Sequence, residues 1–289
     1  MKSGIKTFLI ITLMALGLIF LSSKSALASN ENGSWISSVE AASSDTPSDS
    51  STKDLDIDAR KQILISVLES SQTEISDLKD SLSSIDTNDD DWNKIKNSLL
   101  DTLSGFQDYY QKDEDKINDT DSPITLDEIK TLAKDLKDWR ENTYSPELDK
   151  ITNMILIFKT DDFLNITQSR FDKISSDVKK LDKQKLIKTD SLKSYLKQAD
   201  SHLKNIKTLN DTAKKLFLKS MLPAPTDESS TSTQSLNDAS KNSASDNQTA
   251  QTQEDVQGTI RKIVKDSLKE LKTTYEIFFL MNDKIKSGQ

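Results

Sequence analysis

The sequence predicts an all-α protein: an antiparallel helical bundle of coiled-coil-like helices, preceded by a disordered tether and followed, after a disordered linker, by a last helix. Apolar residues recur at steps of three and four wherever enough of them occur to form a core, and this is the helical period. Of 289 residues only 6 are Gly and 5 are Pro, which leaves little turn chemistry for β-hairpins. The chain has no Cys, so packing rather than disulfides must hold the fold.

The apolar pattern predicts about five helices in a bundle over residues 54–222 and a sixth, amphipathic helix over 255–289. An acidic residue near a helix N-terminus is favoured by the helix dipole, and Thr125 followed by Glu128 has the spacing of a capping box. The bundle helices are expected at 55–85, from the acidic run 89–91 onward, from Thr125 onward, at 145–181 and at 189–221.

Two of these helices have especially regular apolar stripes. The fifth is expected to bury Leu192, Tyr195, Ala199, His202, Ile206, Leu209, Ala213 and Leu216. The sixth is expected to bury Ile260, Val264, Leu268, Leu271, Tyr275 and Phe278. Both sets follow the three-and-four spacing of a helix face that packs against other helices.

The fourth helix has a clear start and an irregular middle. Ser145 is the expected N-cap, with Pro146 at the first helical position. The apolar stripe changes phase near residues 159–162, so we expect either a bend or a change of packing partner there.

The first 28 residues have the pattern of a secretory signal peptide. Lys2 and Lys6 precede an apolar run over residues 8–21, and Ala26-Leu27-Ala28 supplies the small residues that signal peptidase requires. An uncleaved anchor is the alternative, although this run is shorter than the ~20 residues of a spanning helix. We therefore expect an exported protein of the cell envelope, which is periplasmic, on the cell surface or secreted, or membrane-anchored if the signal is retained.

Two segments have too few apolar residues to offset the entropy of ordering. Residues 29–53 are mostly Ser, Asn, Asp, Glu and Ala, and residues 223–254 are rich in Ser, Thr, Asn and Gln after an initial Pro-Ala-Pro. We expect the first to be a disordered tether and the second a disordered linker.

Charge is distributed unevenly along the chain. Residues 54–162 hold 27 acidic and 13 basic side chains, a net charge of −14, whereas residues 170–219 hold 14 basic and 6 acidic ones, a net charge of +8. A basic arm over 170–219 suits an anionic partner such as a protein, an envelope polymer or a lipid surface. Its candidate contact residues are Lys179, Lys180, Lys183 and Lys185.

The alternative to such a binding module is a self-associating coiled-coil spacer, in which basic and acidic helices pair within the molecule or a homo-oligomer. Nucleic acid is an unlikely partner because the chain as a whole is acidic, with a net charge of −8. The last helix adds Phe278 and Phe279 as candidate partner-binding residues, for a membrane surface or a partner groove. We favour instead that this helix folds back to complete the bundle.

No catalytic constellation is recognisable. His202 is the only histidine, and the sequence has no Cys nucleophile, no Gly-rich phosphate loop and no zinc motif. We therefore predict a non-enzymatic protein without cofactor, with a carboxylate-based hydrolase as a remote alternative.

One fragment resembles part of a calcium loop. Asp86, Asn88 and Asp90 have the first ligand spacings, but Asp91 stands where the loop needs Gly and Asn97 where it needs a bidentate Glu. The expected role of this acidic loop is to cap the second helix, so we predict no metal site.

Overall fold

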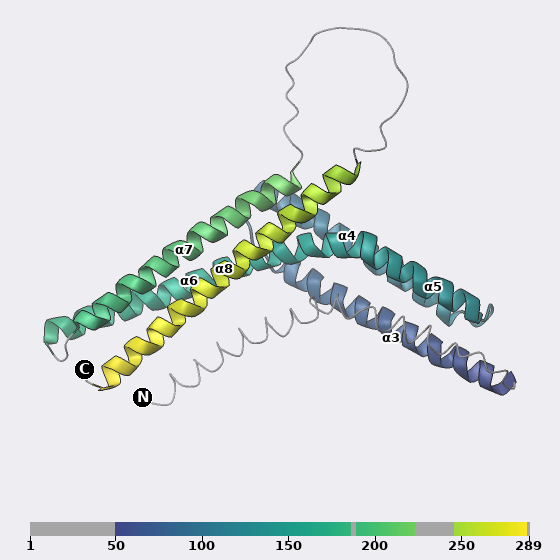
Figure 1. Ribbon diagram of the computed structural model, residues 1–289, viewed down its shortest axis with the longest axis horizontal. Helices are drawn as coiled ribbons and strands as arrows, with labels where there is room; N and C mark the ends of the chain where they lie inside the picture. The colour runs from purple at the N-terminus through teal and green to yellow at the C-terminus, as the bar shows by residue number, and fades with distance from the viewer. Residues whose placement is uncertain (1–49, 186–188, 223–245, 288–289) are drawn as a thin grey trace, which may run out of the picture. The chain divides into compact units, whose positions relative to one another are not determined.

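The computed structural model describes residues 50–185, 189–222 and 246–287, with side chains over 57–185, 189–222 and 256–287. Within these ranges the regular structure is helical and no strand occurs, which confirms the all-α prediction. The helices are α3 (Ser50–Ser83), α4 (Asp90–Asn118), α5 (Leu126–Trp139), the π-helix η2 (Arg140–Tyr144), α6 (Ser145–Gln184), α7 (Asp190–Met221) and α8 (Asp246–Ser287) (Figure 1).

Two helices begin earlier than the sequence predicts. α3 begins at Ser50, inside the expected tether of 29–53, and α8 begins at Asp246, inside the expected linker of 223–254. Once a helix has formed, each added residue contributes a further backbone hydrogen bond, and Ala, Gln and Glu between 246 and 254 have good helix propensity. The rest of the tether, the signal-like segment and the rest of the linker lie outside the described residues.

The chain divides into two compact units. Within the described residues, one unit combines 50–73 with 107–141, and the other combines 74–106 with 142–185, 189–222 and 246–287. In the first unit, the end of α4 packs with α3 and α5: Gln72 Nε2 donates to Glu114 Oε2 at 2.8 Å, and Arg140 Nη1 donates to Tyr110 OH at 2.9 Å.

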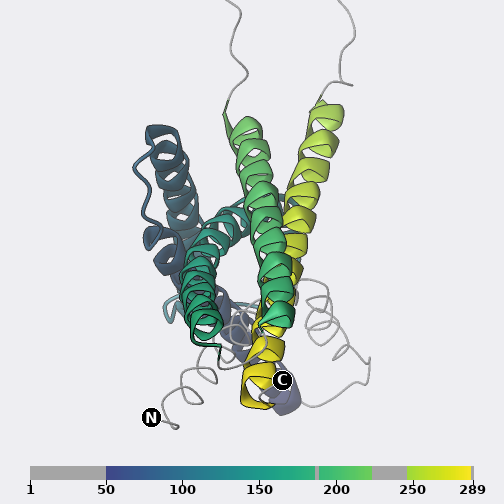
Figure 2. The same ribbon diagram turned by 90° about the vertical axis from the view of Figure 1, so that its left-hand side faces the viewer.

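The second unit contains a three-helix bundle of α6, α7 and α8, which lie side by side in both views (Figures 1 and 2). α6 and α7 are antiparallel and are joined by a short connection, and α8 packs along both. The buried positions of α8 follow alternating steps of three and four, as in a coiled coil. These positions are Gln257, Ile260, Val264, Ser267, Leu271, Thr274, Phe278 and Met281, and Ile277 is buried beside them.

The phase change in α6 corresponds to a change of packing partner. The helix continues unbroken through residues 159–162. Before this point Phe158 packs edge-on against Trp92 of α4, with ring centroids 4.9 Å apart. After it, Phe163 and Phe171 pack against the buried Leu203 of α7 and its neighbours on α8. One continuous helix therefore packs against α4 before residues 159–162 and against α7 and α8 after them.

The predicted stripes of the last two helices are wrong at several positions. On α7, Leu203, Asn210 and Phe217 are buried, whereas His202, Leu209 and Leu216 are only half-buried. On α8, Ser267 and Thr274 are buried in place of Leu268 and Tyr275. The two hydroxyl groups donate to the carbonyl groups of Ile263 and Glu270, which satisfies them inside the core.

The expected cap at Ser145 is also wrong. The residue before α6 is Tyr144, which has helical backbone angles and provides no side-chain cap, because the π-helix η2 leads directly from α5 into α6. Pro146 has no N–H and cannot form the α-helical hydrogen bond to the carbonyl group four residues earlier. The preceding π-turn already interrupts the α-helical hydrogen-bond pattern at this point, so the helix loses no regular bond by having Pro146 there.

Candidate functional site

The four lysines proposed from the sequence lie together at the C-terminal end of α6. Lys179, Lys180, Lys183 and Lys185 are all exposed. Lys180 Nζ lies 3.1 Å from Asp177 Oδ1 in an exposed pair one turn apart. Among the described residues, the other three have no ion-pair partner. Lys185 ends the helix with a left-handed backbone (φ 50°), and its N–H donates to the carbonyl groups of Leu181 and Asp182.

The C-terminal end of α8 lies at the same end of the bundle. One core cluster joins Val178 of α6 and Leu192 of α7 to Ile277, Phe278 and Met281 of α8. Lys284 and Lys286 follow in the last turn of α8. We call this surface the basic end; it consists of Lys179, Lys180, Lys183, Lys185, Lys284 and Lys286.

Asp182, an acidic residue among these lysines on α6, already has hydrogen-bond partners. Asp182 accepts hydrogen bonds from Thr189 and, at 2.9 Å, from Lys193. These two contacts hold the pKa of the Asp182 carboxyl below its ordinary value, with the Thr189 bond the larger cause. Asp182 therefore stays charged and paired with Lys193.

The two candidate phenylalanines of the last helix have different environments. Phe278 is buried in the core cluster between α6, α7 and α8, whereas Phe279 is half-buried. α8 thus packs onto the bundle, as expected of a last helix that folds back, and the ring of Phe278 is occupied inside the unit. Phe279 keeps part of its surface accessible.

Sequence reasoning did not single out two side chains of this region, Lys286 and Ile285. Both are exposed near the end of α8, as is the apolar Leu280, which follows the two phenylalanines in sequence. The three-and-four spacing continues from Met281 to Ile285, which is a signal that the stripe extends to this end of the helix. Only the packing of α8 against α6 places these residues beside the four lysines.

His202 forms a polar contact between two helices. Its Nδ1 lies 2.5 Å from Glu270 Oε2, and both side chains are about 30% exposed. The contact links α7 to α8.

A buried carboxyl group lies in the first unit. Asp113 is 4% exposed, and its burial raises its pKa, although Lys116 at 3.4 Å opposes that shift. The pKa of Tyr109 is raised to about 12, first by burial and then by the charge of Asp113. Tyr109 also stacks on Trp139, with ring centroids 4.1 Å apart. A phenol with this pKa stays protonated at neutral pH and cannot act there as a base.

We expect Asp113→Asn to raise the melting temperature near neutral pH. Because the folded-state pKa of Asp113 is raised, its contribution to stability is complete below the ordinary value of 3.8 and is lost as the pH rises through the folded-state value. The amide of the variant has no charge to bury, so the variant should be more stable than wild type where Asp113 is charged. The difference in melting temperature should shrink as the pH falls toward 3.8, because Asp113 then becomes neutral as well. Thermal unfolding followed by circular dichroism across this range measures it. Asp115→Asn, at an exposed neighbour, is the control, and an equal gain in both variants would contradict the assignment.

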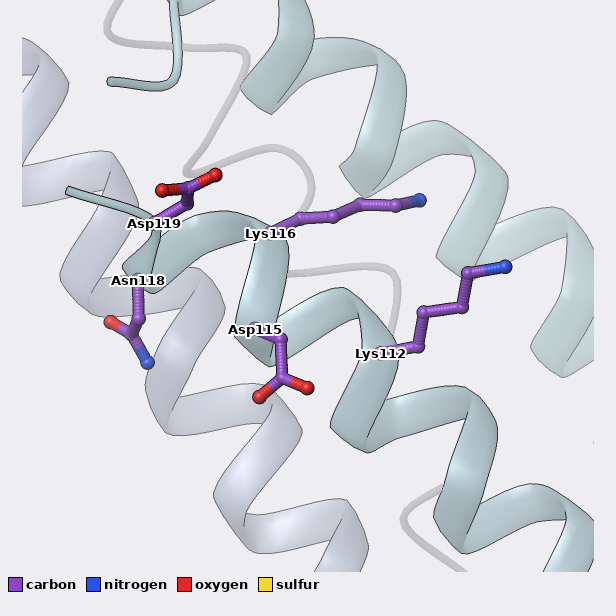
Figure 3. A pocket seen from close by; sticks show the side chains of 5 residues that line it. All are labelled: Lys112, Asp115, Lys116, Asn118 and Asp119. Carbon is purple, nitrogen blue, oxygen red and sulfur yellow. The ribbon is translucent and has the colours of Figure 1, made fainter. Parts of the chain in front are cut away.

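The surface depression in Figure 3 does not have the geometry of a binding site. It is lined by Lys112, Asp115, Lys116, Asn118 and Asp119, all from the last turns of α4 and the residue that follows it. In Figure 3 these side chains point in different directions, so no set of charges converges on one ligand position.

The calcium-like fragment forms a helix cap. Asp89 Oδ1 accepts hydrogen bonds from the N–H groups of Asp91 at 2.9 Å and Trp92 at 3.2 Å, at the start of α4. Within the described ranges, no three or more His, Cys, Asp or Glu side chains are grouped so that they could hold a metal ion.

Among the described helices, none combines the length and the apolar content needed to cross a bilayer. Comparison of the chain with protein-family models, with curated proteins and with solved structures finds no match.

Proposed function

We propose that this chain is an exported, non-enzymatic binding protein of the cell envelope whose basic end engages an anionic partner. The observation that carries the proposal is the gathering of six lysines from α6 and α8, five of them exposed and Lys284 half-buried, at one end of a three-helix bundle. A cluster of like charges on a packed scaffold produces a local field that attracts and orients an anion.

The basic end differs in the sign of its charge from the chain as a whole. The whole chain has a net charge of −8, so the basic end is a local exception on an acidic protein. An anionic partner is attracted to this end and repelled by the acidic segments, which favours one orientation of binding. The attraction acts over about 10 Å at 0.1 M salt, so the binding should be sensitive to ionic strength.

Support for export comes from the sequence of residues 1–28, which combines a basic start, an apolar run and a small-residue cleavage pattern. N-terminal sequencing of the protein from the cells that produce it tests this part of the proposal. A chain that begins at Ser29 would support it, and one that still begins at Met1 would favour the retained anchor.

Support for a binding module over a self-associating spacer comes from the packing of the second unit. The stripes of α6, α7 and α8 are used against one another. The exposed large apolar side chains of the described residues are Ile166, Leu280 and Ile285, which do not form a further helix-pairing seam. A spacer built on coiled-coil pairing would need such a seam.

The test compares two variants of the full chain with the same change in charge. One replaces Lys179, Lys180, Lys183 and Lys185 with Gln, and the control replaces the exposed Lys94, Lys112, Lys130 and Lys134 with Gln. The probe is long-chain inorganic polyphosphate, and the measurement is binding by calorimetry at low salt and at about 0.5 M salt.

We expect wild type and control to bind at low salt and to lose binding at high salt, while the first variant binds about tenfold more weakly or worse, since several charge contacts are lost together. Equal binding by both variants, or no binding by wild type, would contradict the proposal. Sedimentation of the same samples tests the alternative of a self-associating spacer. An oligomer at low salt that dissociates as the salt concentration rises would favour that alternative.

A further inference from the structure

We propose that the anionic partner is a lipid surface, and that Leu280 and Ile285 enter its interfacial region while the lysines of the basic end bind the headgroups. This inference rests on the proposed function and specifies its partner. It starts from the place of the exposed apolar side chains. The described residues include three such large side chains, Ile166 at 46%, Leu280 at 50% and Ile285 at 37% exposure. Two of the three lie in the last turns of α8, at the basic end.

Ile285 is exposed although it continues the buried stripe of α8. Met281 occupies the previous position of this stripe and is 1% exposed, because it packs in the cluster with Val178 and Leu192. Ile285 is the next position of the same stripe, yet it is 37% exposed. An apolar position of the stripe therefore remains accessible at the end of α8.

Lysines flank the second of these apolar side chains. Lys284 and Lys286 lie on either side of Ile285 in the last turn of α8, and Leu280, which has Glu276 and Asp283 within one turn, lies one turn before Lys284. The α6 lysines belong to the same end through the shared core cluster. An apolar side chain flanked by basic ones matches the two layers of an anionic bilayer surface, where acyl chains begin beneath charged headgroups. The long lysine stems can follow the apolar side chains inward while their charges stay in water.

A soluble polyanion would use only part of this surface. Phosphate or carboxylate groups in a polymer would pair with the lysines, but they would gain nothing from exposed Leu or Ile side chains. An anionic bilayer gains from both, and each lysine near its surface contributes about a fivefold increase in affinity. The two partners therefore differ in how they respond when the apolar side chains alone are changed.

The absence of native Cys allows a probe to be placed at one position. Ile285→Cys in the full chain, labelled with a polarity-sensitive fluorophore, should brighten and shift to the blue with vesicles of phosphatidylcholine plus phosphatidylglycerol. It should not change with phosphatidylcholine alone. Ile166→Cys with the same label is the control, because it is similarly exposed but lies in the middle of α6, and it should not respond to either vesicle. A probe at Ile285 that ignores the anionic vesicles would overturn the inference.

A second comparison separates this inference from the proposed function. Leu280→Ser with Ile285→Ser should weaken vesicle binding about tenfold, since two apolar side chains no longer enter the interface, and should leave polyphosphate binding unchanged. Ile166→Ser should change neither. The apolar run over residues 8–21 is present in every variant, so only differences between variants are interpreted. Vesicle binding that is unaffected by the double substitution, with polyphosphate bound through the lysines, would overturn the lipid inference and leave the proposed function standing. If wild type binds neither probe, both fall.

Discussion

Replacing Phe278 with Ala is expected to lower the free energy of unfolding by about 3 kcal/mol, within the range for large-to-small substitutions of buried aromatic residues. The ring lies in the core cluster with Val178, Leu192 and Met281, and it packs edge-on against Tyr275 at 5.8 Å between ring centroids. Its removal leaves a cavity between all three helices of the bundle. Chemical denaturation followed by circular dichroism measures the change.

Leu280→Ala is the matched control, because it truncates an apolar side chain two residues along the same helix at 50% exposure. Its effect should be within about 0.5 kcal/mol, as for most surface substitutions. If Phe278→Ala were as mild as the control, α8 would not be docked as described, and the last helix would be a free recognition element instead.

The second large effect is expected at Asn153, which is completely buried on α6. Its Nδ2 donates to the backbone carbonyl of Gln257 at 3.0 Å and to its Oε1 at 2.9 Å, and Gln257 Nε2 donates to Ser220 Oγ at 3.1 Å. This chain of hydrogen bonds joins α6, α8 and α7. Asn153→Ala should lower the free energy of unfolding by about 2–3 kcal/mol, because it creates a cavity and leaves the buried Gln257 side chain without its donor.

The double variant Asn153→Leu with Gln257→Leu should regain that stability, because two apolar side chains leave no polar group unpaired. It should also weaken the specification of the register of α8, as loss of a buried polar pair does in coiled coils. Asp149 and Arg261, which form an ion pair at 2.6 Å, mark the native register. Cys at both positions should join efficiently through a short bis-maleimide in the otherwise wild-type chain and less efficiently in the double variant. Equal cross-linking would show that the polar contact does not set the register.

The starts of several helices could be predicted because capping is local. Thr125 and Glu128 form the expected capping box: Glu128 Oε2 accepts from the Thr125 N–H at 2.8 Å, and Thr125 Oγ1 accepts from the Glu128 N–H at 3.3 Å. The buried stripe of α4 follows the same three-and-four spacing, and no buried polar residue interrupts it between Trp92 and Tyr110. These positions are Trp92, Ile95, Leu99, Leu103, Phe106 and Tyr110.

Buried polar residues could not be predicted from the same pattern. Asn210 is 1% exposed because its amide donates to the Ile157 carbonyl at 3.1 Å and to Asp161 Oδ1 at 2.5 Å, both on another helix. Hydropathy assigns such a residue to the surface, and only its tertiary partners reverse that assignment. Ser267 and Thr274 are buried for a different reason, because their hydroxyl groups donate to carbonyl groups of α8 itself. The predicted stripes therefore followed the nearest apolar neighbours instead.

The candidate site was predictable in part. The lysines of α6 form a charge cluster that is visible along the sequence, and their exposure agrees with it. Lys284 and Lys286 are separated from them by about a hundred residues of sequence, so their place at the same end depends on how α8 docks. The burial of Phe278 and the partial burial of Phe279 depend on the same docking of α8. The apolar pattern of one helix does not show which neighbouring helices it packs against.

The polar residues at the centre of the bundle also matter for how the chain is made. α8 is synthesised after α6 and α7, so the face of these two helices that receives it is exposed to water until then. That face includes Asn153 and Ser220, and the facing side of α8 includes Gln257. Polar interruptions in an otherwise apolar surface reduce the risk that incomplete chains aggregate with one another. The same side chains that link the finished helices therefore keep both surfaces soluble before they meet.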